Sequence, residues 1–527
     1  METEMLCPTK FDCLSIAPIR LVFVLTLALL YPVVGRSQIH VGPGQKYPDL
    51  GTAAHLRAIH AGDTVFIHAG TYANELYWID SLIGTPDKRI TIMSFGKDSV
   101  SINEQYTFQT AQYVRISGLH FYGDDSTQRS RVFHQLFFDY EYACFTANHD
   151  IIVENCTFTE LNNTGKGSTG ACLKFTGTDN FLVQNCIFRN GTNITDGISL
   201  NGNRHGVIRH CTFENMSGDG SHCKGGTKNI TYEKNLFINC AAGGLDVGGD
   251  TGPTFFCPLG ATWEADSIKV FANVFIGGTT GIKLSSCHNS FIYNNTCFKT
   301  TSFAFRSLNA SSNSIYLDNN YIYNNIFTTY TPNHIYLNAS NNFTYNTEYF
   351  KNNLFHDYRN PDPTTINWSE LPGVNVSGSI IGDPMFTDTA NRDFSLRAGS
   401  PAIGAGVAMS EPVTDYLDKQ YSSSSRSIGA VESQQAGVGS AMRYDEFVLS
   451  PNPCGDWLTI SCKGGVVPSE IRVMDVMGRE VLRTGLVEIA EQNRVDLSSL
   501  DDGAYHLLVR ATDGKGMGQM NFIKLSR

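Results

Sequence analysis

The stretch GISLNGNRHGVIRHCTFEN (Gly197–Asn215) shows how this chain is built. It contains three short runs in which polar and apolar residues alternate, and Asn and Gly separate the runs. Alternation with a period of two is typical of a strand with one buried face, whereas Asn and Gly are typical of turns. The stretch therefore predicts three strands joined by tight turns, which together form one coil of a β-helix.

A motif close to N-[NC]-x-F closes this stretch and recurs along the chain. Its phenylalanines are Phe158, Phe188, Phe213, Phe237, Phe275, Phe298, Phe327 and Phe355, with spacings of 30, 25, 24, 38, 23, 29 and 28 residues. A period in the twenties indicates a solenoid, because one such repeat is too small to bury its own apolar face. Stacked coils lie about 4.8 Å apart, so we expect ladders of Phe158 with Phe188 and of Asn155 with Asn185. A third ladder is expected for Cys156, Cys186 and Cys211.

Composition favours the same fold class. Only 17% of the 527 residues are charged, and the chain contains 49 glycines. Much of the remaining polarity comes from Asn, Ser and Thr, which suit strands and turns better than helices. The formal net charge of −11 offers no basic surface for a polyanion, so we expect no nucleic-acid partner.

The N-terminal region predicts export from the cytoplasm. Arg20 precedes the apolar run LVFVLTLALLYPVVG (Leu21–Gly35), which has the length of a signal-peptide core. We therefore assign residues 1–37 to a signal peptide, with an uncleaved membrane anchor as the alternative. Twelve of the 14 cysteines follow this segment. Cys454 and Cys462 are isolated from the others, and a disulfide between them is one possible state.

The ends of the repeat region resemble a known superfamily. The segment IHVGPGQKYPDLGTAAHLRAIHAGDTVFIHAGTY (Ile39–Tyr72) and the segment GDPMFTDTANRDFSLRAGSPAIGAG (Gly382–Gly406), with SIGAVE (Ser427–Glu432), are similar to the entry and exit of pectate-lyase-like proteins. This resemblance implies a right-handed parallel β-helix over residues 38–432. It implies little about activity, because that superfamily includes lyases, hydrolases, epimerases and non-catalytic adhesins.

A second resemblance covers the tail. After a linker at residues 433–443, the segments FVLSPNPCGDWLTI (Phe447–Ile460), IRVMDVMGREV (Ile471–Val481) and VDLSSLDDGAYHLLVR (Val495–Arg510) are similar to the C-terminal sorting domain of the type IX secretion system of Bacteroidetes. The resemblance implies a small β-sandwich at residues 444–527 that binds the type IX machinery. The protein would then cross the periplasm and be secreted or held at the outer-membrane surface. A carbohydrate-binding module is the alternative for this domain.

One coil breaks the aliphatic pattern of its neighbours. In GDGSHCKGG (Gly218–Gly226), alignment on the residues that follow the strand puts His222 and Lys224 in aliphatic columns. Alignment on the Asp-Gly pairs instead puts His222 opposite Ser199, one residue away, and a β-bulge inside the strand would explain the difference. Because burying an unpaired lysine would cost several kcal/mol, we expect Cys223 to point inward and both polar side chains outward. The predicted outer row is Lys174, Ser199, His222 with Lys224, Asp246 and Lys283.

This cluster can support β-elimination of a uronic-acid polysaccharide. That reaction needs a cation for the sugar carboxylate, a base for the C5 proton and an acid for the leaving oxygen. His222 and Lys224 are the candidate catalytic residues, either of them as the base. The candidate substrate-binding residues are Lys174, Asp246, Lys283 and Trp263. Asp219 and Asp250 are candidate ligands for Ca²⁺, which prefers several oxygen ligands.

Two other interpretations remain open. The row can be part of a non-catalytic glycan-binding groove, with Phe255, Phe256 and Trp263 as one wall of an adhesin-like surface protein. It can also be an ordinary solvated face in which Lys224 pairs with Asp246 one coil away. Whether the protein is an enzyme therefore depends on what these side chains contact.

Overall fold

The structure is a computed structural model that describes residues 37–123, 133–139, 144–163, 170–308, 317–330, 348–359, 374–409, 411–422, 426–433, 447–462, 468–475, 480–485, 492–511 and 517–525. The chain divides into two compact units, with the boundary after Ser433. The predicted signal peptide up to residue 36 and residues 434–443 of the predicted linker lie outside the described residues. No helix within the described ranges is both long and apolar enough to cross a membrane.

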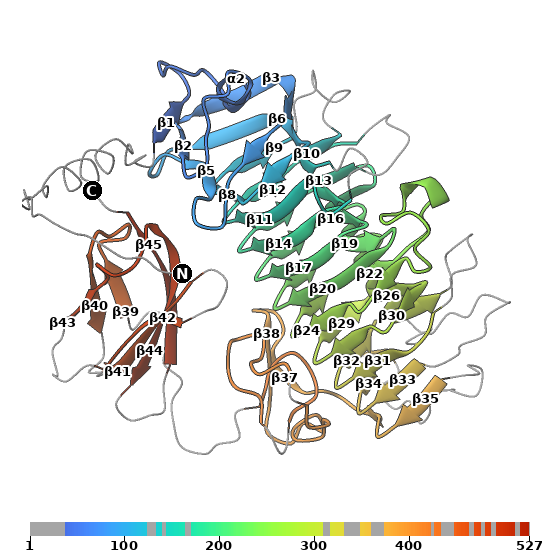
Figure 1. Ribbon diagram of the computed structural model, residues 1–527. Helices are drawn as coiled ribbons and strands as arrows, with labels where there is room; N and C mark the ends of the chain where they lie inside the picture. The colour runs from blue at the N-terminus through green and yellow to red at the C-terminus, as the bar shows by residue number, and fades with distance from the viewer. Residues whose placement is uncertain are drawn as a thin grey trace, which may run out of the picture. The chain divides into compact units, whose positions relative to one another are not determined.

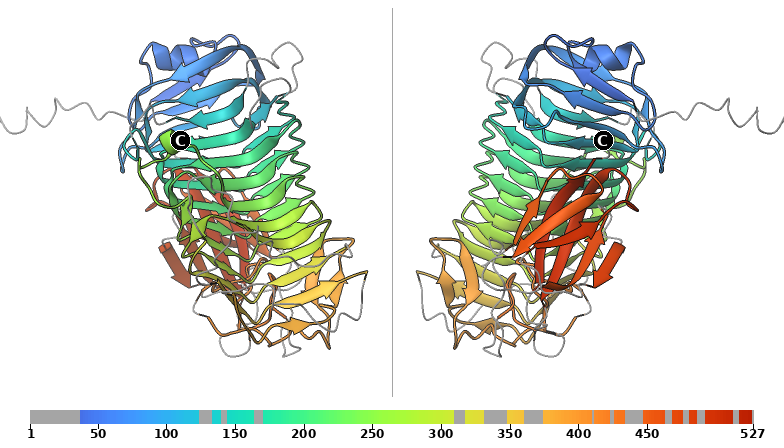
Figure 2. Two further views of the ribbon diagram at one scale, coloured as in Figure 1. Left: turned by 90° about the vertical axis from the view of Figure 1, so that its right-hand side faces the viewer. Right: turned by 90° about the vertical axis from the view of Figure 1, so that its left-hand side faces the viewer.

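The first unit is a solenoid of parallel strands, as the sequence predicts. Its strands pair into sheets of 17 and 19 strands within the described residues. The pairings follow three columns, so each coil has three faces (Figures 1 and 2). In the coil quoted above, β16 (Thr195–Asn201), β17 (Arg204–Arg209) and β18 (Thr212–Glu214) each lie on a different face. The all-β fold and the three-strand coil are thereby confirmed.

Each face is a stack of equivalent strands, one from each coil. The face that carries His222, called the site face, consists of β3 (Gly70–Ile79), β6 (Val100–Phe108), β10 (His134–Phe138), β13 (Gly170–Thr176), β16, β19 (Asp219–Lys224), β22 (Gly243–Gly248), β26 (Thr280–Ser285) and β30 (Phe303–Leu308). The second face consists of β9 (His120–Tyr122), β12 (Thr157–Thr159), β15 (Ile187–Arg189), β18, β21 (Leu236–Ile238), β25 (Val274–Ile276), β29 (Thr296–Thr300), β32 (Ile326–Thr329), β34 (Leu354–Asp357) and β36 (Ile380–Ile381).

The third face has the longest stack. Its main strands are β1 (Gln38–Val41), β2 (Thr64–Ile67), β5 (Ile90–Ser94), β8 (Val114–Ser117), β11 (Asn148–Glu154), β14 (Asp179–Gln184), β17, β20 (Thr227–Glu233), β24 (Lys269–Phe271), β28 (Phe291–Tyr293), β31 (Asn320–Tyr323), β33 (Glu348–Lys351) and β35 (Val374–Ser377). Short strands add to it: β4 (Leu82–Ile83), β7 (Ala111–Gln112), β23 (Ala265–Asp266) and β27 (Cys287–His288).

Stacked aromatic rings fill the core, as the repeat predicts. Phe158 and Phe188 lie with ring centroids 4.8 Å apart and planes 6° apart. The stack continues through Phe213, Phe237 and Phe275 at centroid distances of 4.9, 4.6 and 4.6 Å. Offset stacks of this kind contribute about 0.5–1.5 kcal/mol per pair beyond the area they bury. The predicted cysteine ladder is also present, because Cys156, Cys186 and Cys211 are buried free thiols.

The asparagine ladder runs through a different motif position from the one predicted. Asn155 and Asn185, at the first position, have φ of 53° and 54° and form the turns. The buried ladder occupies the second position, where Asn235, Asn273, Asn295, Asn325 and Asn353 follow the cysteines. In each step the Oδ1 of one Asn accepts a hydrogen bond from the backbone N–H of the Asn one coil before. The first position favours Asn because Asn tolerates the left-handed conformation.

Non-solenoid elements lie at both ends of the first unit. The short helix α2 (Leu50–His55) begins after Asp49, whose carboxylate accepts a hydrogen bond from the Thr52 N–H at 2.6 Å. This helix buries Leu50 in the solenoid core. After the last coil, β37 (Phe386–Asp388) and β38 (Asp393–Leu396) form an antiparallel pair whose apolar residues join a second core cluster. Helix α2 therefore gives the N-terminal end of the stack apolar cover, whereas the segment with β37 and β38 packs along the second face against Val274, Ile326 and Leu354.

The second unit is a small antiparallel β domain. One sheet has the order β39 (Phe447–Ser450), β40 (Trp457–Cys462) and β43 (Gln492–Asp496). The other has the order β42 (Glu480–Gly485), β41 (Pro468–Met474), β44 (Gly503–Ala511) and β45 (Met517–Lys524). The unit has its own apolar core. Cys454 is a buried free thiol, so it forms no disulfide with Cys462.

We predict that Asn295→Ala destabilises the solenoid. The Asn295 Oδ1 accepts the backbone N–H of Asn273 at 3.1 Å, and its Nδ2 donates to the Val270 carbonyl at 2.8 Å. Alanine leaves both buried groups unpaired, and each such group costs about 1–3 kcal/mol. The midpoint of urea unfolding should therefore fall. Asn375→Ala, on the exposed side of β35, is the matched control and should leave the midpoint unchanged. Equal midpoints for the two variants would contradict a stabilising ladder.

Candidate functional site

The strand register on the site face brings the predicted residues into one row. Lys174 of β13 pairs with Ser199 of β16, and Ser199 pairs with His222 of β19. His222 in turn pairs with Asp246 of β22, which pairs with Lys283 of β26. We call Lys174, Ser199, His222, Asp246 and Lys283 the site row. Its order is the order predicted from the sequence.

The extra residue of this coil lies in a turn and not in the strand. The pairings of β19 with β16 and with β22 continue without a register shift around His222. Gly225 and Gly226 occupy the turn that follows, with φ of 66° and 91°, where the preceding coil has only Gly202 between Asn201 and Asn203. The predicted β-bulge is therefore wrong. Cys223 still lies in the core, as expected, because alternation along a regular strand already puts His222 and Lys224 on the outer side.

His222 is held between a carboxylate and a hydroxyl. Its Nδ1 lies 3.0 Å from Asp196 Oδ2, and its Nε2 lies 2.9 Å from Ser199 Oγ. The approach of Nδ1 to Asp196 Oδ2 is an electrostatic contact and not a hydrogen bond, because this carboxylate oxygen has no hydrogen-bond partner among the described residues. In the tautomer that carries its proton on Nδ1, Nε2 accepts the Ser199 hydroxyl. The Asp196 Oδ1 accepts a hydrogen bond from the Asp219 N–H at 2.8 Å. Asp196 and His222 are only 2% and 7% exposed, so this geometry is largely shielded from water.

A second ion pair lies next to this one. Lys283 Nζ is 2.6 Å from Asp246 Oδ2 and 4.0 Å from Asp219 Oδ1. Burial lowers the pKa of Lys283, but Asp246 and Asp219 outweigh it and raise the pKa above its usual value. Burial raises the pKa of Asp219 well above its usual value against the opposing effect of Lys283, and Asp246 and Asp196 raise it further. Lys283 thus neutralises carboxylates within the protein, and Asp246 pairs with Lys283 rather than with Lys224.

Lys174 and Lys224 differ from Lys283 because neither forms an ion pair with a carboxylate among the described residues. The Lys174 Nζ lies 5.6 Å from the centre of the Phe137 ring. Burial, and then the nearby Lys224, lower the pKa of Lys174. The stem of Lys224 packs over Gly249, where an added Cβ would come within 2.8 Å of the lysine Cδ. Within the described part of the chain, these two lysines therefore supply positive charge that no ion pair neutralises.

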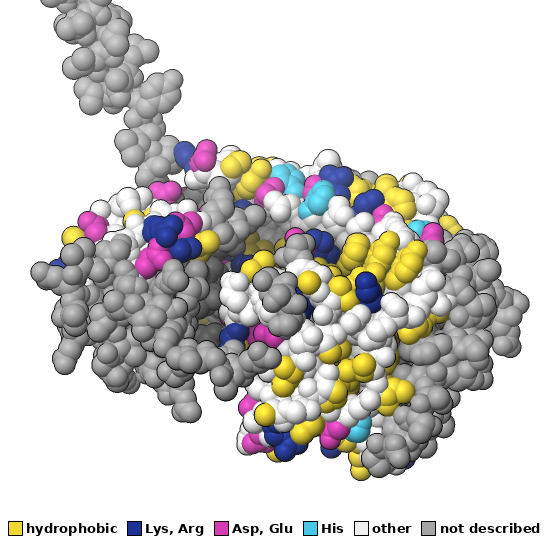
Figure 3. Space-filling model, turned by 90° about the horizontal axis from the view of Figure 1, so that it is seen from below, with side chains coloured by type: hydrophobic (Ala, Val, Ile, Leu, Met, Phe, Trp, Pro, Cys, Tyr) yellow, Lys and Arg dark blue, Asp and Glu magenta, His cyan; other side chains and the backbone are white. Residues whose placement is uncertain are grey.

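This positive charge is a local feature. The surface seen from below carries acidic and basic side chains in a mixture, with no broad area of one sign (Figure 3). The formal net charge of the chain is −11, so an anionic ligand would depend on specific lysines and not on the general field of the molecule.

The structure does not bring the two predicted metal ligands together. Asp219 begins β19, whereas Asp250 follows the end of β22 on the next coil. A strand of six residues separates these ends by roughly 17–20 Å. The side chains that do meet are Asp196, Asp219 and His222, whose ligand atoms lie within 4.8 Å of one another. This set supplies a nitrogen and few oxygens, and one Asp219 oxygen already lies 4.0 Å from Lys283 Nζ, so it does not fit Ca²⁺.

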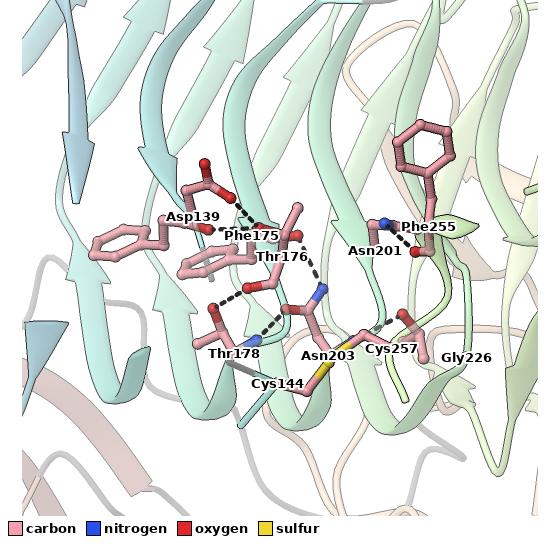
Figure 4. The surroundings of a disulfide bond; sticks show 12 residues. Asp139, Cys144, Phe175, Thr176, Thr178, Asn201, Asn203, Gly226, Phe255 and Cys257 are labelled. Atoms are coloured by element: carbon pink, nitrogen blue, oxygen red, sulfur yellow. Dashed lines mark hydrogen bonds between the residues drawn. A yellow bond between two sulfur atoms is a disulfide. The ribbon is translucent and has the colours of Figure 1, made fainter. Parts of the chain in front are cut away.

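The long excursion at residues 250–264 is fixed beside the site face. A disulfide joins Cys257 to Cys144, 113 residues away (Figure 4). The buried Glu264 carboxylate accepts hydrogen bonds from the Gly225 N–H at 2.9 Å and from the Thr251 N–H at 2.7 Å. The excursion contains the short helix η1 (Pro253–Phe255). Because these contacts are covalent or buried, the excursion is a fixed neighbour of the strand ends.

The three aromatic residues predicted to form one wall have different positions. Phe255 is 64% exposed, and its carbonyl accepts a hydrogen bond from Asn201 Nδ2 at 3.0 Å (Figure 4). Phe256 is buried. Trp263 donates from Nε1 to the Gly226 carbonyl, and its ring lies 5.2 Å from Nζ of Lys228, on the third face. Phe255 is therefore the aromatic side chain of this set that is open to a ligand.

Two residues at the centre of the site had no role assigned from the sequence. Ser199 appeared in the predicted row as an ordinary outward residue, and Asp196 served only to align the coils. The repeated Asp-Gly pair was the available signal, because it puts a carboxylate at the start of both β16 and β19. The contact between Asp196 and His222 crosses from one coil to the next, so it depends on the exact register between them.

Comparison with protein families identifies the two parts of the chain. A family described as right handed beta helix region matches residues 99–255. A family described as secretion system C-terminal sorting domain matches residues 449–521. The chain is thus a right-handed β-helix protein with a C-terminal sorting domain. It is exported by the type IX secretion system to the cell surface or the exterior.

Solved structures show a distant similarity to the chain. The A-module of a mannuronan C-5 epimerase from Azotobacter vinelandii has 12% identity and a TM-score of 0.39, over 63% of this chain and 93% of that one. The catalytic unit of an α-1,3-glucanase from Streptomyces thermodiastaticus has 15% identity and a TM-score of 0.36, over 62% and 64%. A polygalacturonase from Erwinia carotovora has 10% identity and a TM-score of 0.35, over 66% of this chain and 95% of that one. No curated protein matches the sequence. We assign no site residue from these similarities.

We predict that Lys283→Met destabilises the protein and that the loss grows with pH. Without this cation, the buried carboxylates of Asp246 and Asp219 lose their neutralising partner. Burial already raises the pKa of Asp219, and removal of Lys283 raises it further above that of the unfolded chain. Stability is then present at low pH and is lost as pH rises through the folded-state pKa of Asp219. Breaking a buried pair in this way costs about 3–5 kcal/mol.

Thermal unfolding from pH 5 to pH 8 measures this effect. Lys228→Met is the control, because Lys228 pairs with Asp266 at 2.8 Å on the third face but is 42% exposed. Its melting temperature should change little across this range. A Lys283→Met variant that follows the wild type at every pH would show that the pair does not stabilise the fold.

Proposed function

We propose that the protein binds uronic-acid polysaccharide at the site row and cleaves it by β-elimination. The supporting observation is that Lys174 and Lys224 lack a carboxylate partner among the described residues. Lys174 lies in the same row as His222, and Lys224 lies two residues after His222 on β19. A secreted protein with an extended, regular outer face is suited to a linear polymer. A polymer with carboxylate groups supplies the anionic partners that Lys174 and Lys224 do not have among the described residues.

We assign the catalytic roles from the contacts of His222. The Asp196 carboxylate lies 3.0 Å from Nδ1 of His222 and favours a proton there, so the lone pair of Nε2 is the basic position. His222 is then the base that takes the C5 proton of the uronate, and Lys224 is the cation that binds its carboxylate. Lys224 and Lys174 are ammonium groups that can protonate the leaving oxygen. Asp246 and Lys283 hold the row in place through their ion pair.

Lys224→Ala should remove this activity. Loss of the cation leaves the developing negative charge of the transition state without compensation, which lowers kcat by about 10²-fold or more. The full-length protein is incubated with a panel of uronic-acid polysaccharides, and the ultraviolet absorbance of unsaturated products is followed. Lys228→Ala, on the third face, is the control and should retain the wild-type rate.

Three results would speak against this proposal. Wild-type protein that forms no unsaturated product on any uronate, or a Lys224→Ala variant that keeps the wild-type rate, would exclude elimination at this site. Retardation of the wild type in a gel that contains the polysaccharide, without a change in its chain length, would favour a binding module. In that case Phe255→Ala should weaken the retardation, because this aromatic ring is exposed beside the strand ends.

Dependence on Ca²⁺ stays a separate prediction. Because the donor set at Asp196, Asp219 and His222 does not fit this ion, we expect a chelator to leave the elimination rate unchanged. A rate that falls with chelator and returns with added Ca²⁺ would show that ligands outside this set hold a calcium ion.

A further inference from the structure

Ser199 forms a contact for which β-elimination has no use. Its Oγ lies 2.9 Å from Nε2 of His222, and Nδ1 of the same ring lies 3.0 Å from Asp196 Oδ2. For Nε2 to take a sugar C–H proton, the Ser199 hydroxyl must first rotate away from it, so elimination does not use this contact. The order hydroxyl, imidazole and carboxylate is the arrangement that activates a serine as a nucleophile.

We propose that Ser199, His222 and Asp196 form a catalytic triad that hydrolyses O-acyl esters on a polysaccharide. Ser199 is the nucleophile and His222 is the general base and acid. Asp196 is a positioning residue whose carboxylate, 3.0 Å from Nδ1, favours the tautomer with the proton on that nitrogen. This inference goes beyond the elimination proposed above and does not depend on it, although both reactions use His222.

The first half of the reaction transfers the acyl group to the protein. The Ser199 Oγ attacks the acyl carbonyl carbon, and its proton moves to Nε2 of His222. The carbonyl electron pair moves to the oxygen, which becomes an oxyanion. Collapse of this intermediate breaks the bond between the acyl carbon and the sugar oxygen. The sugar oxygen takes the proton from His222 and leaves as a hydroxyl, and the acyl group remains on Ser199.

Water completes the reaction. A water molecule attacks the acyl carbon and gives a proton to Nε2 of His222. The second intermediate then collapses, Ser199 Oγ leaves and takes the proton back, and a carboxylic acid is released. The free serine and the neutral imidazole are restored, so no oxidant or further reactant is needed.

Cations are available for the oxyanion. Lys174 is the residue opposite Ser199 in the register of β13 and β16, and it interacts electrostatically with Lys224. Neither lysine is neutralised by a carboxylate within the described part of the chain, so either can donate to a negative oxygen that develops beside Ser199. Such donors are worth most in a site that excludes water, and Ser199 is only 6% exposed.

The fold explains how three polar residues can be kept in this geometry. Ser199 and His222 lie opposite each other on adjacent strands, about 4.8 Å apart in the backbone. Asp196 lies on the same strand as Ser199, and its other oxygen is fixed by the backbone of Asp219. A set of contacts with a purely structural role would have the same distances. Reactivity of the Ser199 hydroxyl is therefore the property that distinguishes a catalytic triad from a structural set of contacts.

A fluorophosphonate probe tests that reactivity directly. The probe is added to the full-length folded wild type, and the labelled peptide is identified by mass spectrometry. We expect a single label on Ser199, no label in Ser199→Ala, and normal labelling in Ser377→Ala, which changes an exposed serine of β35. A folded wild type without label on Ser199 would overturn the proposal, independently of how any variant folds.

Release of acetate from an O-acetylated uronic-acid polysaccharide is the second measurement. Ser199→Ala should lower kcat by about 10³-fold or more, and Asp196→Asn by about 10²-fold or more with little change in KM. Acetate release by Ser199→Ala at the wild-type rate would overturn the triad. A fall in Asp196→Asn that appears only in KM would overturn the positioning role.

The same variants separate this proposal from the elimination. On a polysaccharide without acyl groups, Ser199→Ala should still form unsaturated product if elimination occurs, whereas His222→Asn should lose both activities. Acetate release without unsaturated product in the wild type would support the triad and remove the elimination. Unsaturated product without acetate release would support the elimination and overturn the triad.

Discussion

Backbone pairing between successive coils is the constraint on which the rest of the structure depends. Each strand of a face binds the equivalent strands before and after it, so residues of equal rank are held one strand spacing apart. Where the strands end, side chains satisfy the backbone N–H groups that have no backbone partner. Asn295 and Asn325 accept such hydrogen bonds from Asn273 and Asn295 of the coil before. Because the core is determined by these ladders, the outward residues can vary without loss of the fold.

On the outer face of the solenoid, this regular spacing brings polar side chains of neighbouring coils into contact. Ser199 meets His222, and Asp246 meets Lys283, because each pair lies on neighbouring strands. Buried carboxylates are costly, and in this row a histidine or a lysine compensates them. Lys174 stands apart, because burial lowers its pKa while no carboxylate within the described residues pairs with it. The row therefore combines ion pairs that stabilise the protein with charge that is available to a ligand.

Much of the fold could be predicted from the sequence, because apolar periodicity reports burial directly. The phenylalanine spacing predicted the coils, although Cys297 and not Phe298 lies opposite Phe275 and Phe327. The order of the outer row followed from aligning the coils. The position of the extra residue could not be predicted, since Gly225 and Gly226 fit either a turn or a shifted strand until the pairing is known. Contacts between distant segments, such as the disulfide of Cys144 with Cys257, leave no local pattern. The role of Asp196 was missed for the same reason, because its partner lies on the next coil.

The turn at Gly225 and Gly226 has a consequence for how such a protein evolves. An added residue there changes the length of a coil without moving any strand out of register, so insertions at turns are nearly neutral. Duplication of a whole coil is tolerated for the same reason, since each coil contacts only its neighbours. The steps within the site row are the exception. A coil inserted between Ser199 and His222, or between Asp246 and Lys283, would move the two residues a further 4.8 Å or so apart, so the lineage can lengthen its solenoid on either side of the row but not within it.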